Sequence, residues 1–374
     1  MAERRRNHNF RMSIISVILF SVLSFLTGAA QPGDPQGADL VFVGDAMQHQ
    51  AQLDRAKELG GGKGYDYTGC FTLIAPEITR ADYAVCNLEV PLGGGPDYSG
   101  FPCFSAPDSY AKALKDAGFD MFLTANNHCL DRRDKGARAT LKALDRLGVD
   151  HIGTYNNAAE RRQKVPFVKN VNGIKIGFLN YTYGTNGIEP NDGIEVSLID
   201  RKRMAEEIAA TRKAGAEIVC VTVHWGTEYV LLPGDAQKSL AQFLADQGVD
   251  LIIGGHPHVI QPMEVLHNNK EGKDVLLVYS LGNFISNMKT DDTRGGALVK
   301  VRVERDQNGK ARFKKAEYDL IFTEKPTGGR TNYRVIPSGL MERLPASQRG
   351  AWKIFERNAR RVFDAHNKGV PAVK

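Results

Sequence analysis

Five short segments carry side chains that can bind a metal ion or transfer a proton, and each one follows an apolar run. They are Gly44-Asp45, Asn87-Leu88-Glu89, Asn126-Asn127-His128, His224-Trp225-Gly226-Thr227-Glu228 and Gly254-Gly255-His256-Pro257-His258. Imidazole, carboxylate and amide ligands together suit divalent zinc, manganese or iron, and no cysteine lies among them. Two such ions a few ångströms apart can activate a water molecule and hold a phosphoryl oxygen. The segments therefore predict a site for one or two divalent metal ions.

The apolar runs before these segments predict the strands of an α/β fold. Short apolar runs alternate with amphipathic stretches, a pattern typical of βα units. Strands are expected at residues 40–43, 83–86, 121–124, 218–223, 251–253 and 275–279, and helices at residues 109–117, 135–147, 201–214 and 236–247. Because ligands bind beyond the carboxyl ends of strands in open α/β sheets, the five segments are expected to meet in one crevice.

Two antiparallel hairpins are also expected. Residues 168–180 are interrupted by Asn172-Gly173, and residues 298–321 are interrupted by Asn308-Gly309, both tight-turn dipeptides. A combination of parallel units and hairpins predicts an α/β fold of four layers, an α-β-β-α sandwich. After about residue 323 the sequence becomes irregular, and a final helix at residues 348–366 is expected to pack on the main domain.

Each polar segment taken alone also permits a purely structural role. Asp45 could cap a helix, His128 could be a hydrogen-bonded loop histidine, and His224 could be a packed core residue bonded to the backbone. His256 and His258 give a stronger signal, because two histidines two apart in an extended chain point to the same side. If all five segments meet, a structural explanation requires unpaired polar groups to gather at an apolar edge, which costs desolvation without return.

The first thirty residues are typical of a secretory signal peptide. Four arginines precede an apolar run at residues 14–26, and small residues follow it at 27–30. The alternative is an uncleaved anchor helix, although the run is shorter than the roughly 20 residues that span a membrane. Either interpretation places the body in the periplasm or cell envelope. A lipid anchor would need a cysteine just after the run, and the first cysteine is Cys70.

The expected organisation is a signal peptide at 1–30, a linker at 31–38, a main domain at 39–322 and a C-terminal tail with a packing helix at 323–374. The leader carries four arginines and one glutamate, so its removal lowers the net charge from +6 to about +3, too little to indicate nucleic-acid binding. The cysteines lack CxxC spacing. Cys86 and Cys220 are expected to be buried, and Cys70 with Cys103 is the first pair to test for a disulfide.

Six motifs in order resemble those of the CapA family, called PgsA in poly-γ-glutamate systems. They are Gly44-Asp45-Ala46-Met47, Asn87-Leu88-Glu89, Ala125-Asn126-Asn127-His128, His224-Trp225-Gly226-Thr227-Glu228-Tyr229, Gly255-His256-Pro257-His258-Val259 and Ser280-Leu281-Gly282-Asn283-Phe284. The resemblance runs from about residue 39 to residue 285. The family is similar to calcineurin-like metallophosphatases, which implies the same four-layer sandwich.

The resemblance also implies a role for each candidate ligand. Asp45 would bind one metal ion and His258 would return to it, while Asn87 or Glu89 would stand at the place of a bridging carboxylate. The second ion would be bound by Asn127, His224 and His256. His128 would be the general acid or proton donor, and Glu228 is the second candidate catalytic residue.

The sequence departs from the metallophosphatase pattern at two places. Met47 stands where those enzymes carry a histidine, and thioether sulfur is a poor ligand for a hard ion. The bridging aspartate is also replaced within the segment from Asn87 to Glu89. The first metal site is therefore expected to be weak, empty or completed by His49.

The function implied by the resemblance is synthesis, export or attachment of a capsule-like anionic polymer of the poly-γ-glutamate type. Its expected partners are the polymer or a phosphoester substrate and membrane-bound synthase or export proteins, without nucleic acid. One alternative is a metal-dependent phosphatase or phosphodiesterase acting outside the cytoplasm. The other alternative is a non-catalytic scaffold that binds the polymer.

Overall fold

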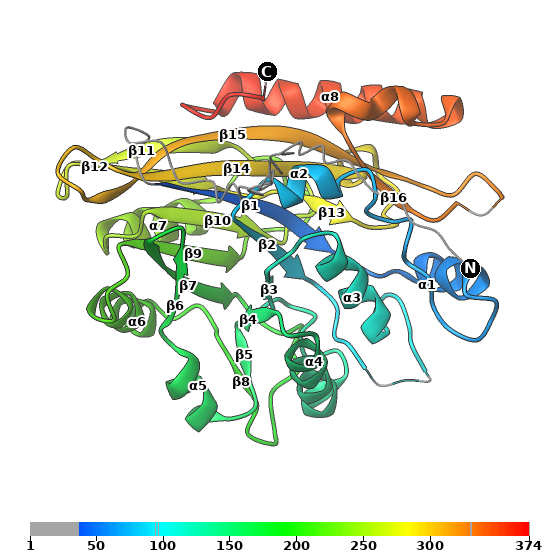
Figure 1. Ribbon diagram of the computed structural model, residues 1–374, viewed down its shortest axis with the longest axis horizontal. Helices are drawn as coiled ribbons and strands as arrows, with labels where there is room; N and C mark the ends of the chain where they lie inside the picture. Colours follow the sequence, from blue (N-terminus) through cyan, green and yellow to red (C-terminus); the bar gives the residue numbers. More distant parts are fainter. Residues whose placement is uncertain (1–36, 94, 96, 330, 374) are drawn as a thin grey trace, which may run out of the picture. The chain divides into compact units, whose positions relative to one another are not determined.

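The computed structural model describes residues 37–93, 95, 97–329 and 331–373, which form two large β-sheets with helices outside them (Figure 1). The expected signal peptide and residues 31–36 of the expected linker lie outside the described residues. The first sheet has the strand order β16 (Arg334–Pro337), β15 (Ala311–Glu324), β14 (Gly295–Arg305), β1 (Gly37–Ala46), β2 (Tyr83–Leu88), β3 (Met121–Leu123) and β4 (Asp150–Ile152), with β13 (Asn283–Ile285) beside β1.

The second sheet combines a parallel centre with an antiparallel strand on each side. Its order is β11 (Met263–Asn268), β12 (Lys273–Val278), β10 (Leu251–Gly255), β9 (Ile218–His224), β7 (Ile174–Thr182) and β6 (Phe167–Val171). The pairs β6–β7 and β14–β15 are antiparallel, which confirms both predicted hairpins. A small separate ribbon pairs β5 (Thr154–Tyr155) with β8 (Glu195–Val196).

Alternating side chains along the strands explain how the layers stack. In β1, Leu40 and Phe42 belong to the apolar core that also contains Ile176 and Phe178 of the second sheet, whereas Val41 belongs to the core beneath the helices. The outer face of the first sheet packs against α3 (Asp108–Asp116) and α4 (Arg133–Leu147). The outer face of the second sheet packs against α6 (Arg201–Lys213) and α7 (Asp235–Asp246). The predicted four-layer α-β-β-α sandwich is confirmed.

The predicted strands and helices agree with the structure to within a few residues, but several elements were not predicted. The helices among them are α1 (Gln50–Leu59), α2 (Ala75–Thr79) and α5 (Ala158–Lys164). In α1 most residues are polar and the buried ones are Gln52, Leu53 and Ala56, so an apolar period is nearly absent from its sequence. Two short 3₁₀ helices, η1 (Asp291–Thr293) and η2 (Ser338–Arg343), also lack such a signal.

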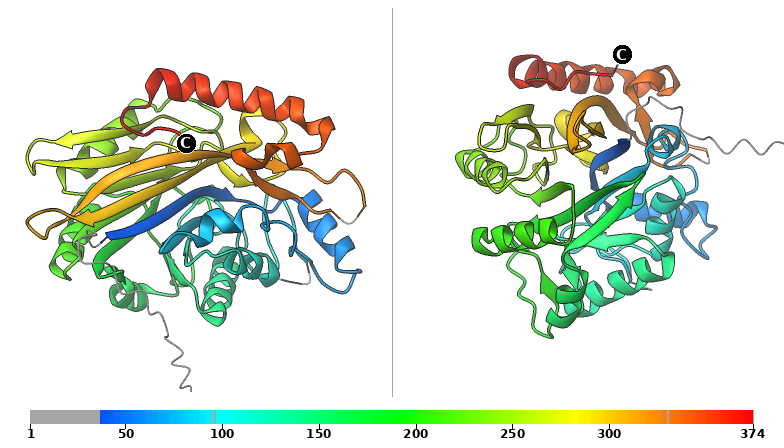
Figure 2. Two further views of the ribbon diagram at one scale, coloured as in Figure 1. Left: turned by 45° about the horizontal axis from the view of Figure 1, so that its top comes forward. Right: turned by 60° about the vertical axis from the view of Figure 1, so that its left-hand side comes forward.

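The C-terminal segment packs on the first sheet (Figure 2). Strand β16 pairs with the end of β15, and α8 (Ala346–His366) lies along β15. The rings of Trp352 and Phe355 contact Phe322, while Phe363 contacts Tyr318 with 4.5 Å between ring centroids. Such aromatic contacts add to the area burial that holds an amphipathic helix on a sheet. The division at residue 323 stays a prediction.

All five cysteines are unpaired, and Cys70 is buried while Cys103 is exposed, so the suggested disulfide between them is not formed. Cys86 and Cys220 are fully buried in the cores, as expected. Within the described part of the chain, no helix combines the length and the apolar character that crossing a membrane requires.

Candidate metal centre

The carboxyl ends of strands from both sheets meet at one place. In the first sheet, Asp45 of β1 lies opposite Asn87 of β2, and in the second sheet His224 of β9 lies opposite Gly255 of β10. The Asn87 Nδ2 atom is 3.4 Å from His224 Nδ1, so the two sheets are joined by side chains at this edge. The structure therefore brings the predicted segments together from two sheets.

Three groups of carboxylate and imidazole atoms lie close enough to share a cation. Within each group the ligand atoms are within 4.8 Å of one another, and the groups are Glu89 with His224 and His256, Asp45 with Glu89 and His258, and Glu228 with His256 and His258. Glu89 Oε1 lies between two of the histidines, 3.6 Å from His224 Nε2 and 3.7 Å from His258 Nε2. Of Asn87 and Glu89, Glu89 is therefore the residue whose position would allow it to bridge two metal ions.

Asp45 is held in place from three directions. Asn87 Nδ2 donates a hydrogen bond to Asp45 Oδ1 at 2.7 Å, and the backbone N–H of His256 donates to Oδ2 at 3.3 Å. The Nδ1 atom of His258 is 3.3 Å from the same Oδ2. Because the Asn87 amide points its nitrogen at Asp45, this side chain orients the carboxylate.

Two buried polar atoms of the cluster have no hydrogen-bond partner among the described residues. They are Glu89 Oε1 and His256 Nδ1, in residues that are 0 % and 3 % exposed. Leaving such atoms unpaired costs free energy, and buried polar atoms are ordinarily paired. A divalent cation between the groups would satisfy both atoms, and their chemistry suits zinc, manganese or iron. The residues present thus fit a bound metal ion.

Burial and neighbouring charges shift the pKa values of the cluster. Burial alone would raise the pKa of Asp45, but the His258 hydrogen bond and the nearby His224 hold it below its usual value. Burial and the adjacent Asp45 raise the pKa of Glu89 well above its usual value. Burial, with the neighbouring imidazoles, lowers the pKa of His224 well below its usual value and that of His256 to about 4. Both imidazoles are therefore neutral at pH 7, the form in which histidine binds a metal ion.

The backbone at His256 and His258 corrects one expectation. His256 and His258 do not lie in an extended chain, because their φ angles are 99° and 58°. Non-glycine residues seldom adopt positive φ, and such strain concentrates at functional sites. Their ring centroids are 6.0 Å apart, so the turn at Pro257 still brings both rings to the cluster. A Cβ atom on Gly255 would lie 2.9 Å from Asp45 Oδ1, so the glycine makes room for that carboxylate.

Asn127 and His128 approach the cluster from the loop after β3. Asn127 Oδ1 is 2.8 Å from His224 Nε2. His128 Nδ1 is 2.8 Å from Asp131 Oδ2, and its ring lies edge-on to Phe104 at 4.7 Å. Asp131 was not predicted; the available signal was its position three residues after His128.

Asn283 is a second residue that the sequence analysis left without a role. It lies opposite Asp45 in the pairing of β1 with β13, and its Oδ1 is 3.1 Å from His258 Nδ1. Its Nδ2 donates a hydrogen bond to the Thr293 carbonyl at 2.9 Å, which fixes the amide. Its place in the sixth motif was the signal that could have identified it.

Met47 and His49 lie at the side of the cluster. Met47 is buried in the apolar core between the first sheet and its helices, and its carbonyl accepts a hydrogen bond from the Tyr110 hydroxyl. His49 Nδ1 accepts a hydrogen bond from the Asn287 N–H at 3.2 Å. Among the described residues, His49 belongs to none of the three donor groups. Met47, the first departure from the metallophosphatase pattern, is thus part of the apolar core.

Two half-exposed tyrosines flank the histidines and were not predicted. Tyr183 is 48 % exposed, with its ring centroid 4.6 Å from that of His256. Tyr229 is 55 % exposed, with its ring centroid 6.2 Å from that of His258. These rings form apolar walls beside the cluster.

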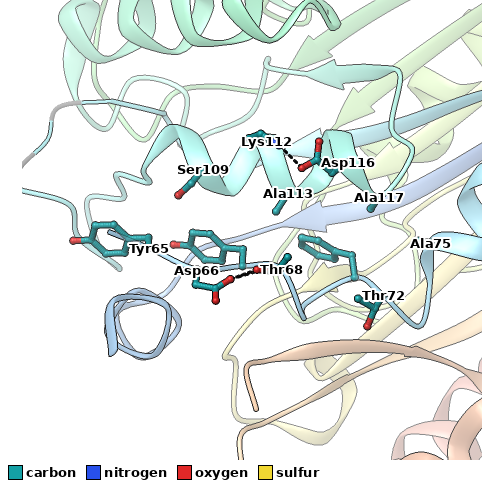
Figure 3. Close-up of a pocket in the computed structure, with 12 residues that line it drawn as sticks. Tyr65, Asp66, Thr68, Thr72, Ala75, Ser109, Lys112, Ala113, Asp116 and Ala117 are labelled. Carbon is teal, nitrogen blue, oxygen red and sulfur yellow. Dashed lines mark hydrogen bonds and ion pairs between the residues drawn. The ribbon is translucent and has the colours of Figure 1, made fainter. Parts of the chain in front are cut away.

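A larger cavity lies elsewhere, against α3. Its volume is about 280 Å³. Figure 3 shows its lining residues, which come from α3 and from the chain between Tyr65 and Ala75. The Lys112–Asp116 pair lies on its α3 side, and its lining includes no candidate metal ligand. A small cavity of about 20 Å³ borders the metal-ligand cluster, lined in part by Asp45 and His224. That volume exceeds the roughly 10–15 Å³ that a water molecule needs.

Comparison with known proteins gives the family context. Residues 39–288 match the family model described as bacterial capsule synthesis protein PGA_cap. Capsule biosynthesis protein CapA of Bacillus anthracis is 32% identical over 282 residues, covering 73% of this chain and 65% of that protein. PGA biosynthesis protein CapA of Bacillus subtilis (strain 168) is 30% identical over 283 residues, covering 75% and 70%. Haemophilus influenzae NAD nucleotidase NadN aligns with a TM-score of 0.47 at 10% identity, over 87% of this chain and 68% of that chain.

Proposed function

Since this chain belongs to the bacterial capsule synthesis protein family, we propose that it acts in synthesis, export or attachment of a capsule-like anionic polymer of the poly-γ-glutamate type. The observation that supports an active site in this role is the pair of unpartnered buried atoms, Glu89 Oε1 and His256 Nδ1. Such atoms are uncommon in native proteins, and a bound ion is one of the explanations for them. The names of both Bacillus relatives agree with a role in polymer formation.

The proposed metal ligands follow from the three donor groups. Asp45, Glu89 and His258 would hold one divalent ion, and Glu89, His224 and His256 would hold a second, with Glu89 shared. Asn87 orients Asp45, and Asn127 lies beside His224 as a further oxygen ligand. When bound, the ions would supply Lewis acidity for hydrolysis of an acyl or phosphoryl bond.

Two residues beside the metal-ligand cluster, His128 and Glu228, are proposed to transfer protons. The Asp131 carboxylate holds His128 Nδ1 at 2.8 Å, so that Nε2, once the imidazole is doubly protonated, is the atom that would give a proton to a leaving group. Asp131 is thus a positioning residue, and its Oδ2 is itself fixed by the Phe104 N–H at 2.7 Å. Glu228 groups with His256 and His258 and would act as an additional base or metal ligand.

The proposed location is the outer side of the cytoplasmic membrane. Residues 1–30 would direct export, and residues 39–322 would form the functional domain with residues 323–374 packed on it. Membrane-bound synthase or export proteins would be the partners that deliver the polymer.

The test is polymer output in a bacterium that depends on this protein. Glu89→Gln removes the shared carboxylate charge, and Glu206→Gln removes a carboxylate charge at an exposed site on α6 and serves as the control. We expect Glu89→Gln to abolish extracellular polymer at normal protein levels, while the control retains it. Normal polymer output from Glu89→Gln would refute a metal-dependent role. Turnover of simple phosphodiesters by the purified protein, lost in His128→Ala, would instead assign a phosphodiesterase.

A further inference from the structure

The end of β15 reaches the same edge of the first sheet as the candidate metal centre. Strand β14 is antiparallel to both β1 and β15, so β1 and β15 run in the same direction. Lys325, just after β15, therefore leaves the sheet at the edge where Asp45 lies near the end of β1. Adjacent strands are about 4.8 Å apart, which places the two strand ends on the order of 10–15 Å from each other.

Two cations at this end of β15 lack an acidic partner. Lys325 Nζ donates to the Met288 carbonyl at 3.0 Å, and Arg294 donates to Gln348 Oε1 at 2.7 Å. Within the residues that the structure describes, neither side chain forms an ion pair with a carboxylate, and neither does neighbouring Lys289. Arg294 Nε is buried without a hydrogen-bond partner.

The electrostatics of this cluster favour an added anion. Burial, with the nearby charges of Arg294 and Lys289, lowers the pKa of Lys325 to about 8. Burial lowers the pKa of Arg294 too, although Asp291 opposes this from beyond ion-pair distance. A carboxylate beside the two cations would reverse both effects.

The cluster is held rigidly and is connected to the candidate metal centre. Gln348 of α8 accepts hydrogen bonds from both Arg294 and the Lys325 backbone N–H, and the Arg294 guanidinium lies 4.6 Å from the centroid of the Phe322 ring. Met288, which binds Lys325 through its carbonyl, has its sulfur 3.3 Å from Asn283 Nδ2. Asn283 in turn contacts His258, so one continuous set of contacts joins the cations to the metal-ligand cluster.

We propose that Lys325 and Arg294 form a carboxylate-binding subsite that holds one acidic group of a linear polyanion while another part of the same chain lies at the candidate metal centre. This subsite deepens the proposed function and rests on it. The two sites are farther apart than the length of a single hydrogen bond. Their separation therefore suits a ligand that carries repeated carboxylates along its chain. It also gives the C-terminal helix a role in binding, because Gln348 positions both cations.

The experiment measures binding of two fluorescent oligomers to the full protein by anisotropy. One is a γ-linked glutamate oligomer, and the other is the same oligomer with its side carboxylates converted to amides. The variants are Lys325→Gln, which removes the charge, and Lys325→Arg, which keeps it. Lys315→Gln is the matched control, since Lys315 is an exposed lysine toward the other end of β15 and has no ion pair within the described residues.

We expect Lys325→Gln to weaken binding of the glutamate oligomer by about fivefold or more, because a charge-assisted hydrogen bond is lost. Lys325→Arg and Lys315→Gln should bind it like the wild type, and the amide oligomer should be insensitive to all three changes. Equal binding of the glutamate oligomer by Lys325→Gln and wild type would overturn the subsite, while its loss in His256→Ala would leave the proposed function standing. Failure of the wild type to bind either oligomer would overturn both.

Discussion

The two ends of β10 both carry buried charged or titratable residues, but their pairing differs. Before the strand, Asp250 accepts from Lys273 Nζ at 2.7 Å and from the Val219 N–H at 2.7 Å, and it also binds Arg212. After the strand, His256 has a positive φ and an unpartnered Nδ1 atom. Complete pairing is typical of a structural ion pair, whereas strain and missing partners are typical of a binding site. The two ends are therefore expected to respond differently to substitution.

The largest expected effect is on stability at the start of β10. Asp250→Ala removes the buried carboxylate that pairs with Lys273 Nζ, in a side chain only 3 % exposed, and leaves the more exposed Glu271 as its ion-pair partner. The change also removes the acceptor of Arg212 and of the Val219 N–H. We expect the free energy of unfolding to fall by about 3–5 kcal/mol in chemical denaturation, without loss of metal binding by the folded protein. Asp246→Ala, at a carboxylate 3.8 Å from Lys270, should cost about 1 kcal/mol or less. A loss of less than about 1 kcal/mol of unfolding free energy in Asp250→Ala would contradict the expected difference between the two ends of β10.

A smaller effect is expected at the carboxyl end of β10. It concerns metal affinity. Asn283→Ala removes the oxygen that lies 3.1 Å from His258 Nδ1 and orients the ring. Loss of such a supporting group weakens metal binding by about 10- to 100-fold, which isothermal titration with zinc or manganese would measure. Asn268→Ala is the control, since this buried asparagine donates to the Ala245 carbonyl away from the cluster. Equal metal affinity of the two variants would remove Asn283 from the site.

The smallest effect concerns the amino-terminal end of β2. Tyr83→Phe removes a hydroxyl that donates to Asp150 Oδ2 at 2.7 Å, while Lys169 still pairs with that carboxylate. The expected loss is about 0.5–1.5 kcal/mol of unfolding free energy, with metal content unchanged. A drop in bound metal would show that this edge of the sheet also supports the site.

The sequence predicted the sandwich and the meeting of the polar segments because both follow from patterns along the chain. Apolar runs mark the strands, and the polar residues follow the runs directly. His256 illustrates the limit, since an extended chain was expected and the backbone takes positive φ values that only tertiary contacts impose. Asp131 and Asn283 were missed as partners of His128 and His258, because pairing between side chains depends on how loops fold back.

The burial of Met47 and the formation of α1 could not be predicted from the sequence pattern either. Whether Met47 faces the metal-ligand cluster or the apolar core depends on the path of the chain after β1, and the structure places it in the core. The polar sequence of α1 gives almost no periodic signal, although the helix forms beside the site.

The most direct test of the metal centre is the metal content of the purified protein by plasma mass spectrometry. His256→Ala and Asp45→Ala remove two ligands, and His267→Ala removes an exposed histidine that pairs with Asp274 and serves as the control. We expect about one or two equivalents of a divalent metal in the wild type and in the control, and a clear loss in the two ligand variants. A wild type without metal that takes up no zinc, manganese or iron on titration would contradict the metal centre.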